Sequence, residues 1–336
     1  MQEVFLVAEL SANHNQSKSL ALETIQAAKE SGANAIKLQT YTPDCLTIDS
    51  SLEYFKIKGT IWEGKNFYQL YKEAMTPWEW HEELFNYAKS LGLVCFSTPF
   101  SSKAVEFLES LGNPIYKVAS FEIVDLELIR IIAKTKKPII LSKGIATEDE
   151  ISDALEVCRQ EGLEDITLLQ CTSSYPTPLE EANLALIPKL KQDFNIKVGL
   201  SDHTLGERAA VVAVALGASV IEKHFILNRN LGGVDSAFSM EPQEFSSMAK
   251  AIQETTQLLG NASYELSPKS KEGRAFMRSL FVVSDIQQGE IIKPHQIRSI
   301  RPGYGIAPKN LHKILGKKAK YNLKRGNPLK EGDWID

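Results

Sequence analysis

Two histidines in the second half of the chain each stand just past a short apolar run. Residues 198–200 lead into the sequence SDH, which ends in His203, and residues 219–221 lead into EKH, which ends in His224. If both runs are strands of a parallel β/α barrel, the two imidazoles meet at the mouth formed by the strand carboxyl ends. Two neutral imidazoles can hold one divalent metal ion and leave positions open for water or substrate. We therefore predict a metal site at this pair; a hydrogen-bonding structural role for each histidine is the simpler alternative.

The elements that must position these histidines alternate regularly along the chain. Apolar runs typical of buried strands are followed by segments with helical spacing. Eight such units in one pass predict a (β/α)8 TIM barrel, an α/β fold. The predicted strands are residues 4–8, 35–38, 94–96, 115–118, 138–141, 166–169, 198–200 and 219–221. The predicted helices are residues 20–31, 78–90, 102–111, 126–133, 148–160, 183–193, 208–216 and 243–259.

Polar side chains gather at the predicted strand ends. Lysines together with serine and threonine hydroxyls favour an anion that carries a phosphate and a carboxylate. The chain has no P-loop and no GxGxxG motif, so a nucleotide is not indicated. Asp202 and Glu222 are also open to interpretation as salt-bridge partners at the barrel rim. The strand-end set is Glu9, Lys37, Gln39, Thr98, Lys117, Ser120, Glu122, Ser142, Ser173, Tyr175, Ser201, His203, Glu222 and His224.

A second chemistry is open at the same mouth. A buried lysine in a barrel strand can form a Schiff base with a carbonyl substrate, as in class I aldolases. Lys37 and Lys117 are the candidates for this reaction. The paired histidines argue against it, because a Schiff-base aldolase needs no metal.

Two segments depart from the barrel pattern. Residues 41–77 form a long, irregular insertion rich in aromatic residues, which either closes over a substrate or fixes the insertion to the barrel. After residue 260 the pattern becomes short apolar runs and turns. We predict a barrel domain of residues 1–260, a polar linker of residues 261–275 and a small second domain of residues 276–336.

Bulk properties exclude several classes of protein. The net charge of -4 provides no basic field for nucleic acid. The sequence shows no signal peptide and no apolar run long enough to span a membrane. Its four cysteines lack a CxxC spacing, which fits a reducing compartment. We therefore expect a cytoplasmic protein without a membrane partner.

Several motifs together resemble the sialic acid synthase family over essentially the full chain. They are Ala8-Glu9 with Asn13-His14-Asn15, Lys37-Leu38-Gln39-Thr40, Ser97-Thr98-Pro99-Phe100, Tyr116-Lys117-Val118-Ala119-Ser120, Cys171-Thr172 with Tyr175-Pro176, Gly199-Leu200-Ser201-Asp202-His203-Thr204 and Glu222-Lys223-His224-Phe225. The C-terminal segment with Arg301-Pro302-Gly303 is similar to the antifreeze-like SAF domain of that family.

The resemblance implies a reaction and a role for each residue. Phosphoenolpyruvate would condense with an amino-sugar aldehyde and water to give a nine-carbon acidic sugar and phosphate. His203 and His224 match ligands of Mn2+, Mg2+ or Co2+, and Glu9 matches the catalytic acid/base. Lys37, Thr98, Lys117, Ser120, Ser142, Ser173 and Ser201 match phosphoenolpyruvate-binding positions; at Ser173 sialic acid synthases carry Asn. Gln39, Glu122, Tyr175, Glu222, Asp235, Phe238 and Arg301 match the sugar side, with Arg301 lent by the partner in a domain-swapped homodimer.

Three features resemble the branch of the family that makes pseudaminic acid. They are the loop from Glu9 to Asn13, the insertion around Trp62, and the run GGVDSAFS that ends at Ser239. That branch uses a 2,4-diacetamido-2,4,6-trideoxy sugar. The alternatives are an N-acetylneuraminate or legionaminate synthase with the same mechanism, the Schiff-base aldolase, and a binding module that rests on the SAF domain alone. The glycan that receives the product, such as flagellin or capsule, stays open.

Overall fold

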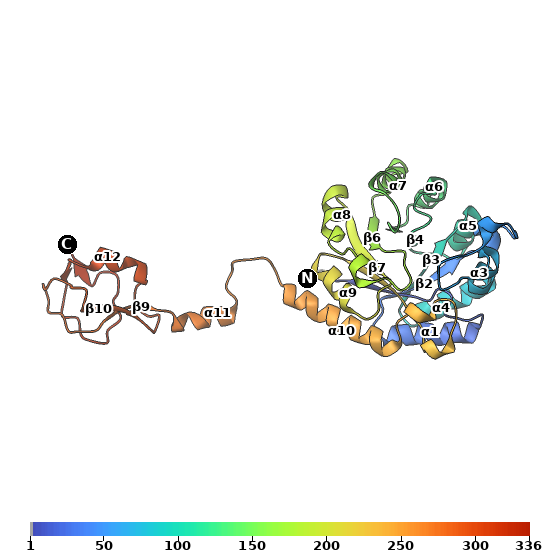
Figure 1. Cartoon of the computed structure of the whole chain (residues 1–336). Helices are drawn as coiled ribbons and strands as arrows, with labels where there is room; N and C mark the ends of the chain where they lie inside the picture. Colours follow the sequence, from blue (N-terminus) through green and yellow to red (C-terminus); the bar gives the residue numbers. More distant parts are fainter. Residues whose placement is uncertain (1–2) are drawn as a thin grey trace. The chain divides into compact units, whose positions relative to one another are not determined.

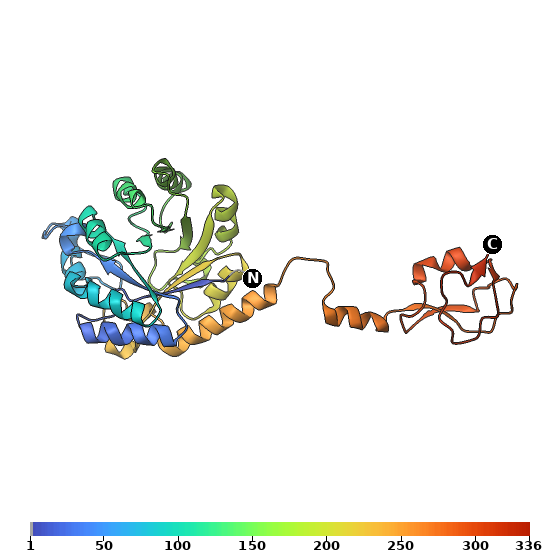
Figure 2. The same ribbon diagram turned by 180° about the vertical axis from the view of Figure 1, so that it is seen from behind.

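The computed structural model describes residues 3–336, which fall into two compact units. Unit 1 is Met1–Asn261 and unit 2 is Ala262–Asp336. Residues 1 and 2, which the predicted barrel domain includes, lie outside the described residues. Figure 1 and the view from behind in Figure 2 show unit 1 as a ring of strands surrounded by helices.

The strands of unit 1 form a closed, parallel barrel in chain order, so the predicted TIM-barrel fold is confirmed. Strand β1 pairs with β2 and also with β8, which closes the ring. The strands are β1 Phe5–Glu9, β2 Ala35–Thr40, β3 Val94–Pro99, β4 Tyr116–Val118, β5 Ile139–Ser142, β6 Ile166–Cys171, β7 Lys197–Asp202 and β8 Val220–His224.

Eight long helices cover the outside of the barrel. They are α1 Lys18–Glu30, α4 His81–Ser90, α5 Ser102–Ser110, α6 Leu126–Lys134, α7 Glu148–Gln160, α8 Leu186–Phe194, α9 Arg208–Ala215 and α10 Pro242–Leu259. Thr147 and Glu150 form a capping box at the start of α7, as their spacing predicts. Helix α8 begins three residues later than predicted, because the chain still turns through a positive φ of 45° at Asn183.

Strand alternation divides the inside of the barrel into an apolar layer and a polar layer. Side chains two residues apart on a strand point the same way. The apolar layer contains Val7, Ala35, Phe96, Ile140, Leu169 and Val220. Two residues further toward the mouth stand Glu9, Lys37, Thr98, Ser142, Cys171 and Glu222. The lower layer therefore plugs the barrel, and the upper layer forms the floor of its mouth.

Gly199 belongs to the plug layer and has no side chain. A Cβ atom at this position would lie 2.4 Å from the carbonyl oxygen of Val220 and 2.6 Å from Leu169. Strands β7 and β8 can approach this closely only because residue 199 is a glycine. This close approach brings the strand ends that carry His203 and His224 together.

The insertion at residues 41–77 is more ordered than predicted. It contains helix α2 Pro43–Leu46, the 3-10 turn η1 Glu53–Phe55 and helix α3 Phe67–Ala74. Asn66 caps α3 by accepting a hydrogen bond from the backbone of Gln69 at 2.8 Å, and Gln69 completes a capping box. The C-terminal end of the insertion contacts the loop after β1, because Gln16 donates hydrogen bonds to the carbonyl oxygens of Glu73 and Met75.

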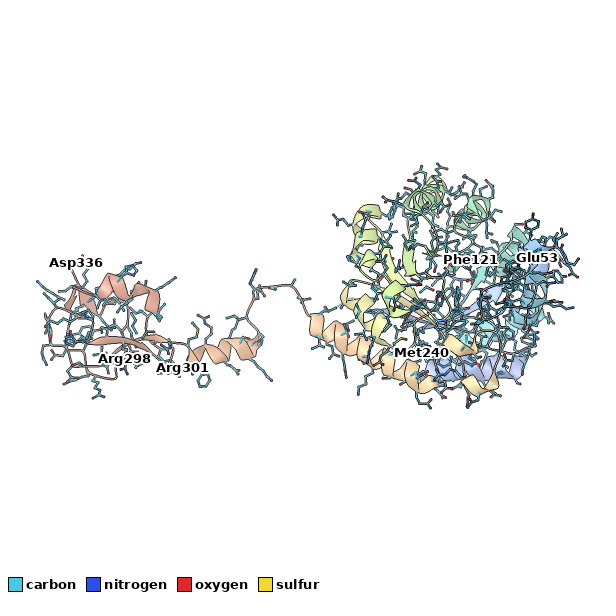
Figure 3. All side chains as sticks on the ribbon, viewed as in Figure 1. Glu53, Phe121, Met240, Arg298, Arg301 and Asp336 are labelled. Atoms are coloured by element: carbon cyan, nitrogen blue, oxygen red, sulfur yellow. The ribbon has the colours of Figure 1, made fainter. Side chains whose placement is uncertain are left out.

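Unit 2 has a small core of its own and short paired strands. Strand β9 Ser279–Val282 pairs with β10 Ile297–Ile300, and β11 Lys318–Ala319 pairs with β12 Trp334–Ile335. Helix α12 Leu311–Ile314 packs on the core with Ile314. The polar run predicted as a linker contains helix α11 Pro268–Gly273, which starts after the capping residue Ser267. Figure 3 labels Arg298 and Arg301 on this unit. Among the described residues, no helix is long and apolar enough to cross a membrane.

Candidate active site

Two carboxylates and two ammonium groups lie together in the polar layer. Glu9, Lys37, Lys117 and Glu222 are 1%, 4%, 2% and 6% exposed, respectively. Glu9 forms an ion pair with Lys37, its neighbour in the β1–β2 register. The Nζ atoms of Lys37 and Lys117 each lie 3.9 Å from an oxygen of Glu222. Each buried charge thus has an opposite charge nearby, which offsets the cost of removing it from water.

Hydroxyl groups surround these four charges. The Nζ of Lys37 lies 3.2 Å from Thr98 Oγ1, and Ser201 donates to Glu222 over 3.0 Å. The hydroxyls of Ser120 and Ser173 lie 2.8 Å apart. Ser142 Oγ is buried and has no hydrogen-bond partner within residues 3–336. The predicted strand-end hydroxyls therefore converge, and that of Ser142 is available to a ligand.

Gly144 brings a backbone turn against the serine pair. Its φ is +39°, and a Cβ atom would lie 2.1 Å from Ser120 Cβ and 2.9 Å from Ser173 Oγ. Only a residue without a side chain fits this position. The sequence SKG after β5 contains this glycine, but its spacing alone does not indicate which side chains it meets.

The two buried carboxylates have pKa values shifted in opposite directions. Burial raises the pKa of Glu9 to about 7; the charge of Glu222 adds to the rise, and Lys37 opposes it. Burial alone would also raise the pKa of Glu222, but the ammonium groups of Lys117 and Lys37 lower it below its ordinary value. Glu222 is therefore ionised near neutral pH, while Glu9 can give or take a proton. Carboxylates whose environments push their pKa values apart in this way are suited to acid/base chemistry.

The two lysines also differ. Burial would lower the pKa of Lys37, but the carboxylates of Glu222 and Glu9 outweigh it and raise that pKa. Burial lowers the pKa of Lys117, and the nearby charge of Lys37 adds to this effect. Lys37 is therefore the more firmly charged of the two.

The predicted histidine pair is present at the barrel mouth. The ring centroids of His203 and His224 lie 5.4 Å apart. His203 Nδ1 lies 3.0 Å from the carbonyl oxygen of Thr172, so Nδ1 carries the proton and Nε2 presents a lone pair. His224 Nδ1 is buried, has no hydrogen-bond partner in the described part of the chain and lies 3.8 Å from Asp235 Oδ2.

These histidines suit a divalent metal ion. Burial lowers the pKa of His203, and burial together with the charge of His203 lowers that of His224 well below its ordinary value. Both rings are therefore neutral, as a metal ligand must be. Across residues 3–336, no three His, Cys, Asp or Glu side chains are grouped to hold a metal. The pair thus fits an ion that takes its other ligands from water or substrate.

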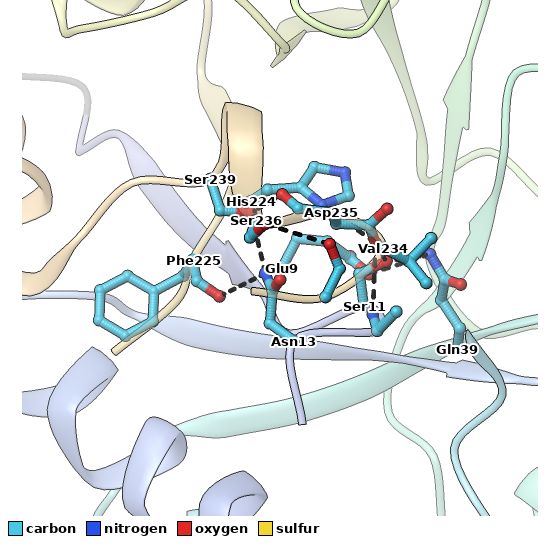
Figure 4. A network of polar contacts seen from close by, with 12 residues as sticks. Glu9, Ser11, Asn13, Gln39, His224, Phe225, Val234, Asp235, Ser236 and Ser239 are labelled. Carbon is cyan, nitrogen blue, oxygen red and sulfur yellow. Dashed lines mark hydrogen bonds and ion pairs between the residues drawn. The ribbon is translucent and has the colours of Figure 1, made fainter. Parts of the chain in front are cut away.

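Asp235 is held at the mouth by the loop after β1. Ser11 donates a short hydrogen bond to Asp235 Oδ2, and Gln39 donates to both Ser11 (3.0 Å) and Glu9 (3.3 Å). Asn13 supports the same segment by donating to Ser239 Oγ over 2.8 Å. Figure 4 shows this network from close by. The sequence motifs do not single out Ser11 as a site residue; its position two residues after Glu9, the last residue of β1, is the feature that indicates it.

A buried ion pair stands behind the two histidines. Strand alternation turns Asp202 and Lys223 toward the outer helices, while Ser201, Glu222 and His224 face inward. Lys223 Nζ lies 2.7 Å from Asp202 Oδ2 and also donates to the carbonyl oxygens of Thr204 and Gly206. Its three N–H groups are thus all used, and they secure the loop that carries His203. The rim salt bridge considered for Asp202 exists, but it is fully buried.

A cavity of about 600 Å³ opens above the polar layer. The barrel contributes Gln39, Ser120, Glu122, Ser173, Tyr175, His224, Asp235 and Phe238 to its lining. The insertion contributes Tyr54, Lys56, Ile57, Lys58, Thr60, Trp62, Phe67, Leu70 and Tyr71. Five of the seven residues predicted for the sugar line the cavity, namely Gln39, Glu122, Tyr175, Asp235 and Phe238. Glu222, also predicted for the sugar, does not line it and lies in the layer beneath with Glu9, Lys37, Thr98, Lys117, Ser142 and Ser201. Arg301 belongs to unit 2.

Comparison with known families identifies the class of protein. Residues 24–264 match the NeuB family, and residues 277–333 match the SAF domain. The chain belongs to the NeuB family. This confirms the resemblance to sialic acid synthases that the motifs indicate.

Individual relatives cover almost the whole chain. A pseudaminic acid synthase of Helicobacter pylori is 52% identical, over 99% of this chain and 98% of that protein. An N,N'-diacetyllegionaminic acid synthase of Campylobacter jejuni is 36% identical, over 98% of this chain and 100% of that protein. The structure of an N-acetylneuraminic acid synthetase from Leptospira borgpetersenii superposes with a TM-score of 0.72 at 32% identity, covering 81% of this chain and 90% of that one.

We predict that Lys223→Met destabilises the barrel by about 3–5 kcal/mol, because it leaves the buried Asp202 carboxylate without its partner. The control is Lys197→Met on the neighbouring strand β7, which removes an exposed ion pair with Asp165 and should cost at most about 1 kcal/mol. Urea unfolding followed by circular dichroism measures both. Equal effects of the two substitutions would contradict the structural role of Lys223.

Proposed function

We propose that this chain is a pseudaminic acid synthase. The reaction joins phosphoenolpyruvate, 2,4-diacetamido-2,4,6-trideoxy-β-L-altropyranose and water into pseudaminic acid and phosphate. The observation that carries the proposal is the layer of two lysines and two carboxylates directly beneath the cavity, beside the histidine pair. The similarity to the Helicobacter pylori enzyme supports the choice of sugar.

Phosphoenolpyruvate fits the polar layer by charge and by donor type. Lys37 and Lys117 supply positive charge to its phosphate and carboxylate, and the hydroxyls of Thr98, Ser142 and Ser201 supply hydrogen bonds. Ser120 and Ser173, packed against Gly144, extend this set toward the cavity. The ligand would leave its enol carbon facing the cavity, where the aldehyde of the sugar enters.

Glu9 is suited to move the proton of the attacking water. After the enol carbon bonds to the aldehyde carbon, positive charge develops at the carbon that bears the phosphate. Water adds to that carbon, and ionised Glu9 accepts one proton from the water and returns it to the alkoxide formed from the aldehyde oxygen. The hydroxyl of the tetrahedral adduct then gives its proton to the departing phosphate as the ketone forms. Gln39 orients the Glu9 carboxylate through its 3.3 Å hydrogen bond. A pKa of about 7 lets Glu9 perform this step near neutral pH.

His203 and His224 would hold the divalent metal, which is Mn2+, Mg2+ or Co2+. The bound ion would supply Lewis-acid polarisation of the aldehyde. The protein sets up this position in advance, since Thr172 fixes the tautomer of His203 and the buried Lys223 secures its loop.

The remaining predicted roles are part of the proposal. Gln39, Glu122, Tyr175, Asp235 and Phe238 would contact the sugar from the cavity wall. Arg301 would act from the SAF domain of the partner in a domain-swapped homodimer, which makes the active site composite.

The four cysteines are free thiols, in keeping with the proposed cytoplasmic location.

One observation keeps a second candidate function in view. The lowered pKa of Lys117 is what a Schiff-base lysine requires. Borohydride trapping with pyruvate would label Lys117 in an aldolase and would leave the proposed synthase unlabelled.

The proposed function is tested by phosphate release from phosphoenolpyruvate with Mn2+. We expect release with the 2,4-diacetamido-2,4,6-trideoxy-altrose substrate, none with N-acetylmannosamine, and loss of activity in EDTA that added Mn2+ restores. Preference for N-acetylmannosamine or for the legionaminate precursor would overturn the assigned sugar and keep the mechanism. Release that is insensitive to EDTA would contradict the metal site.

The raised pKa of Glu9 predicts a pH dependence. Below about pH 7 Glu9 becomes protonated and cannot accept a proton from water, so kcat/KM should fall tenfold per pH unit on the acid side. Glu9→Gln should lower kcat by about 10²–10⁴-fold and abolish this acid limb. Burial also raises the pKa of Glu122 to about 7, so Glu122→Gln is the matched control and should retain the limb. If the acid limb is lost in Glu122→Gln and retained in Glu9→Gln, Glu122 is the base and the assignment to Glu9 is wrong.

A further inference from the structure

A small hairpin of the insertion presents one tryptophan to the cavity. A backbone bridge between Lys56 and Asn66 closes its neck, and Ile57 donates to the carbonyl oxygen of Lys65 at 3.0 Å. Trp62 lies near the tip, between Gly59 and Gly64, which both have positive φ. Residues 58–61, 63 and 64 are exposed, whereas Trp62 is half-buried. The hairpin therefore turns its largest apolar side chain inward.

Trp62 contacts a loop of the barrel that is itself held in place. Its indole Nε1 donates to the carbonyl oxygen of Val234 over 2.9 Å. Asn15 secures this loop by donating to the carbonyl oxygen of Gly232 at 3.0 Å, and it packs so closely that a Cβ atom on Gly233 would lie 2.1 Å from its Oδ1. The hydrogen bond of Trp62 therefore joins the insertion to the segment that carries Asp235.

An aromatic row continues from Trp62 to the histidines. Ring centroids lie 5.7 Å apart for Trp62 and Tyr175, 5.1 Å for Tyr175 and Phe238, and 4.8 Å for Phe238 and His224. All four side chains line the cavity. One wall of the cavity is thus aromatic from the proposed reaction centre to its outer edge.

The chemistry fixes which part of the sugar meets the outer end of this wall. The aldehyde carbon must lie at the histidines and the polar layer, so the opposite end of the sugar points toward the insertion. An aromatic wall stabilises apolar groups, and at its outer end the single N–H of Trp62 already donates to the carbonyl oxygen of Val234, so the indole offers no hydrogen-bond partner to an added hydroxyl. The group that fits there is a methyl group.

We propose that Trp62 is a specificity-determining residue that recognises a methyl group at the far end of the sugar. This inference rests on the proposed function, because it assumes an amino-sugar aldehyde that enters with its reactive carbon toward His203 and His224. The methyl group belongs either to C6 of a 6-deoxy sugar or to an acetamido substituent. Both sources share the same chemistry, and substrate analogues distinguish them.

The experiment compares Trp62→Ala and Trp62→Phe with the wild-type enzyme on three sugars. They are the diacetamido-trideoxy sugar, its analogue with a hydroxymethyl group restored at C6, and its analogue with a hydroxyl in place of the 4-acetamido group. We expect the wild-type enzyme to prefer the diacetamido-trideoxy sugar by about 10–200-fold in kcat/KM over the analogue that lacks the recognised methyl group. Trp62→Ala should reduce this preference at least tenfold, mainly through the KM for the sugar, and change the KM for phosphoenolpyruvate less than twofold. Trp62→Phe should retain most of the preference.

The matched control is Ile61→Ala, which removes an exposed apolar side chain from the same hairpin and should leave all three sugars unaffected. Unchanged preference in Trp62→Ala, or an equal loss for all sugars and for phosphoenolpyruvate, would overturn the role of Trp62. If the wild-type enzyme rejects the diacetamido sugar and accepts another amino sugar, the proposed function is wrong. The same comparison on the accepted sugar and its analogues then tests Trp62 separately.

Discussion

The mouth of this barrel depends on the balance of four buried charges. Burying one carboxylate or ammonium group alone costs several kcal/mol, and here Glu9, Lys37, Lys117 and Glu222 share one layer in which each has an opposite charge nearby. The same balance shifts the pKa values of the two carboxylates apart. Stability and chemistry therefore meet in the same layer, since the ion pairs permit the burial of these charges and the burial raises the pKa of Glu9 to about 7.

Strand alternation distributes the other tasks around this layer. Inward positions alternate between the plug and the polar floor, and Gly199 lets β7 and β8 approach each other beside Leu169. Outward positions carry the Asp202–Lys223 pair, which secures the His203 loop from behind. The insertion completes the site from above, because Trp62 joins it to the Asp235 segment. Under the proposed function, binding of the anion would fall to the polar layer, placement of the metal to the histidine pair and selection of the sugar to the aromatic wall.

Much of this arrangement is predictable from the sequence, because it follows from a period of two along strands that end together. That logic places Glu9, Lys37, Lys117, Glu222 and both histidines at one mouth. It does not identify interactions that depend on register or on loop packing. The partner of Asp202 is found only when β7 is aligned with β8, and the approach of Gly144 to Ser120 depends on a turn. The insertion lacks a strong periodic signal, so its helix α3 and the contact of Trp62 with Val234 appear only in the structure.

The central claim is that the lysines of the polar layer bind phosphoenolpyruvate. Isothermal titration calorimetry of phosphoenolpyruvate with the wild-type protein and with Lys37→Met and Lys117→Met tests it directly, with circular dichroism to confirm folding and Lys197→Met as a surface control. Loss of a buried charged partner costs about 2–5 kcal/mol, so we expect binding at least thirtyfold weaker in both variants and unchanged in the control. Wild-type affinity in Lys37→Met and Lys117→Met would contradict the assignment of the polar layer as the phosphoenolpyruvate site.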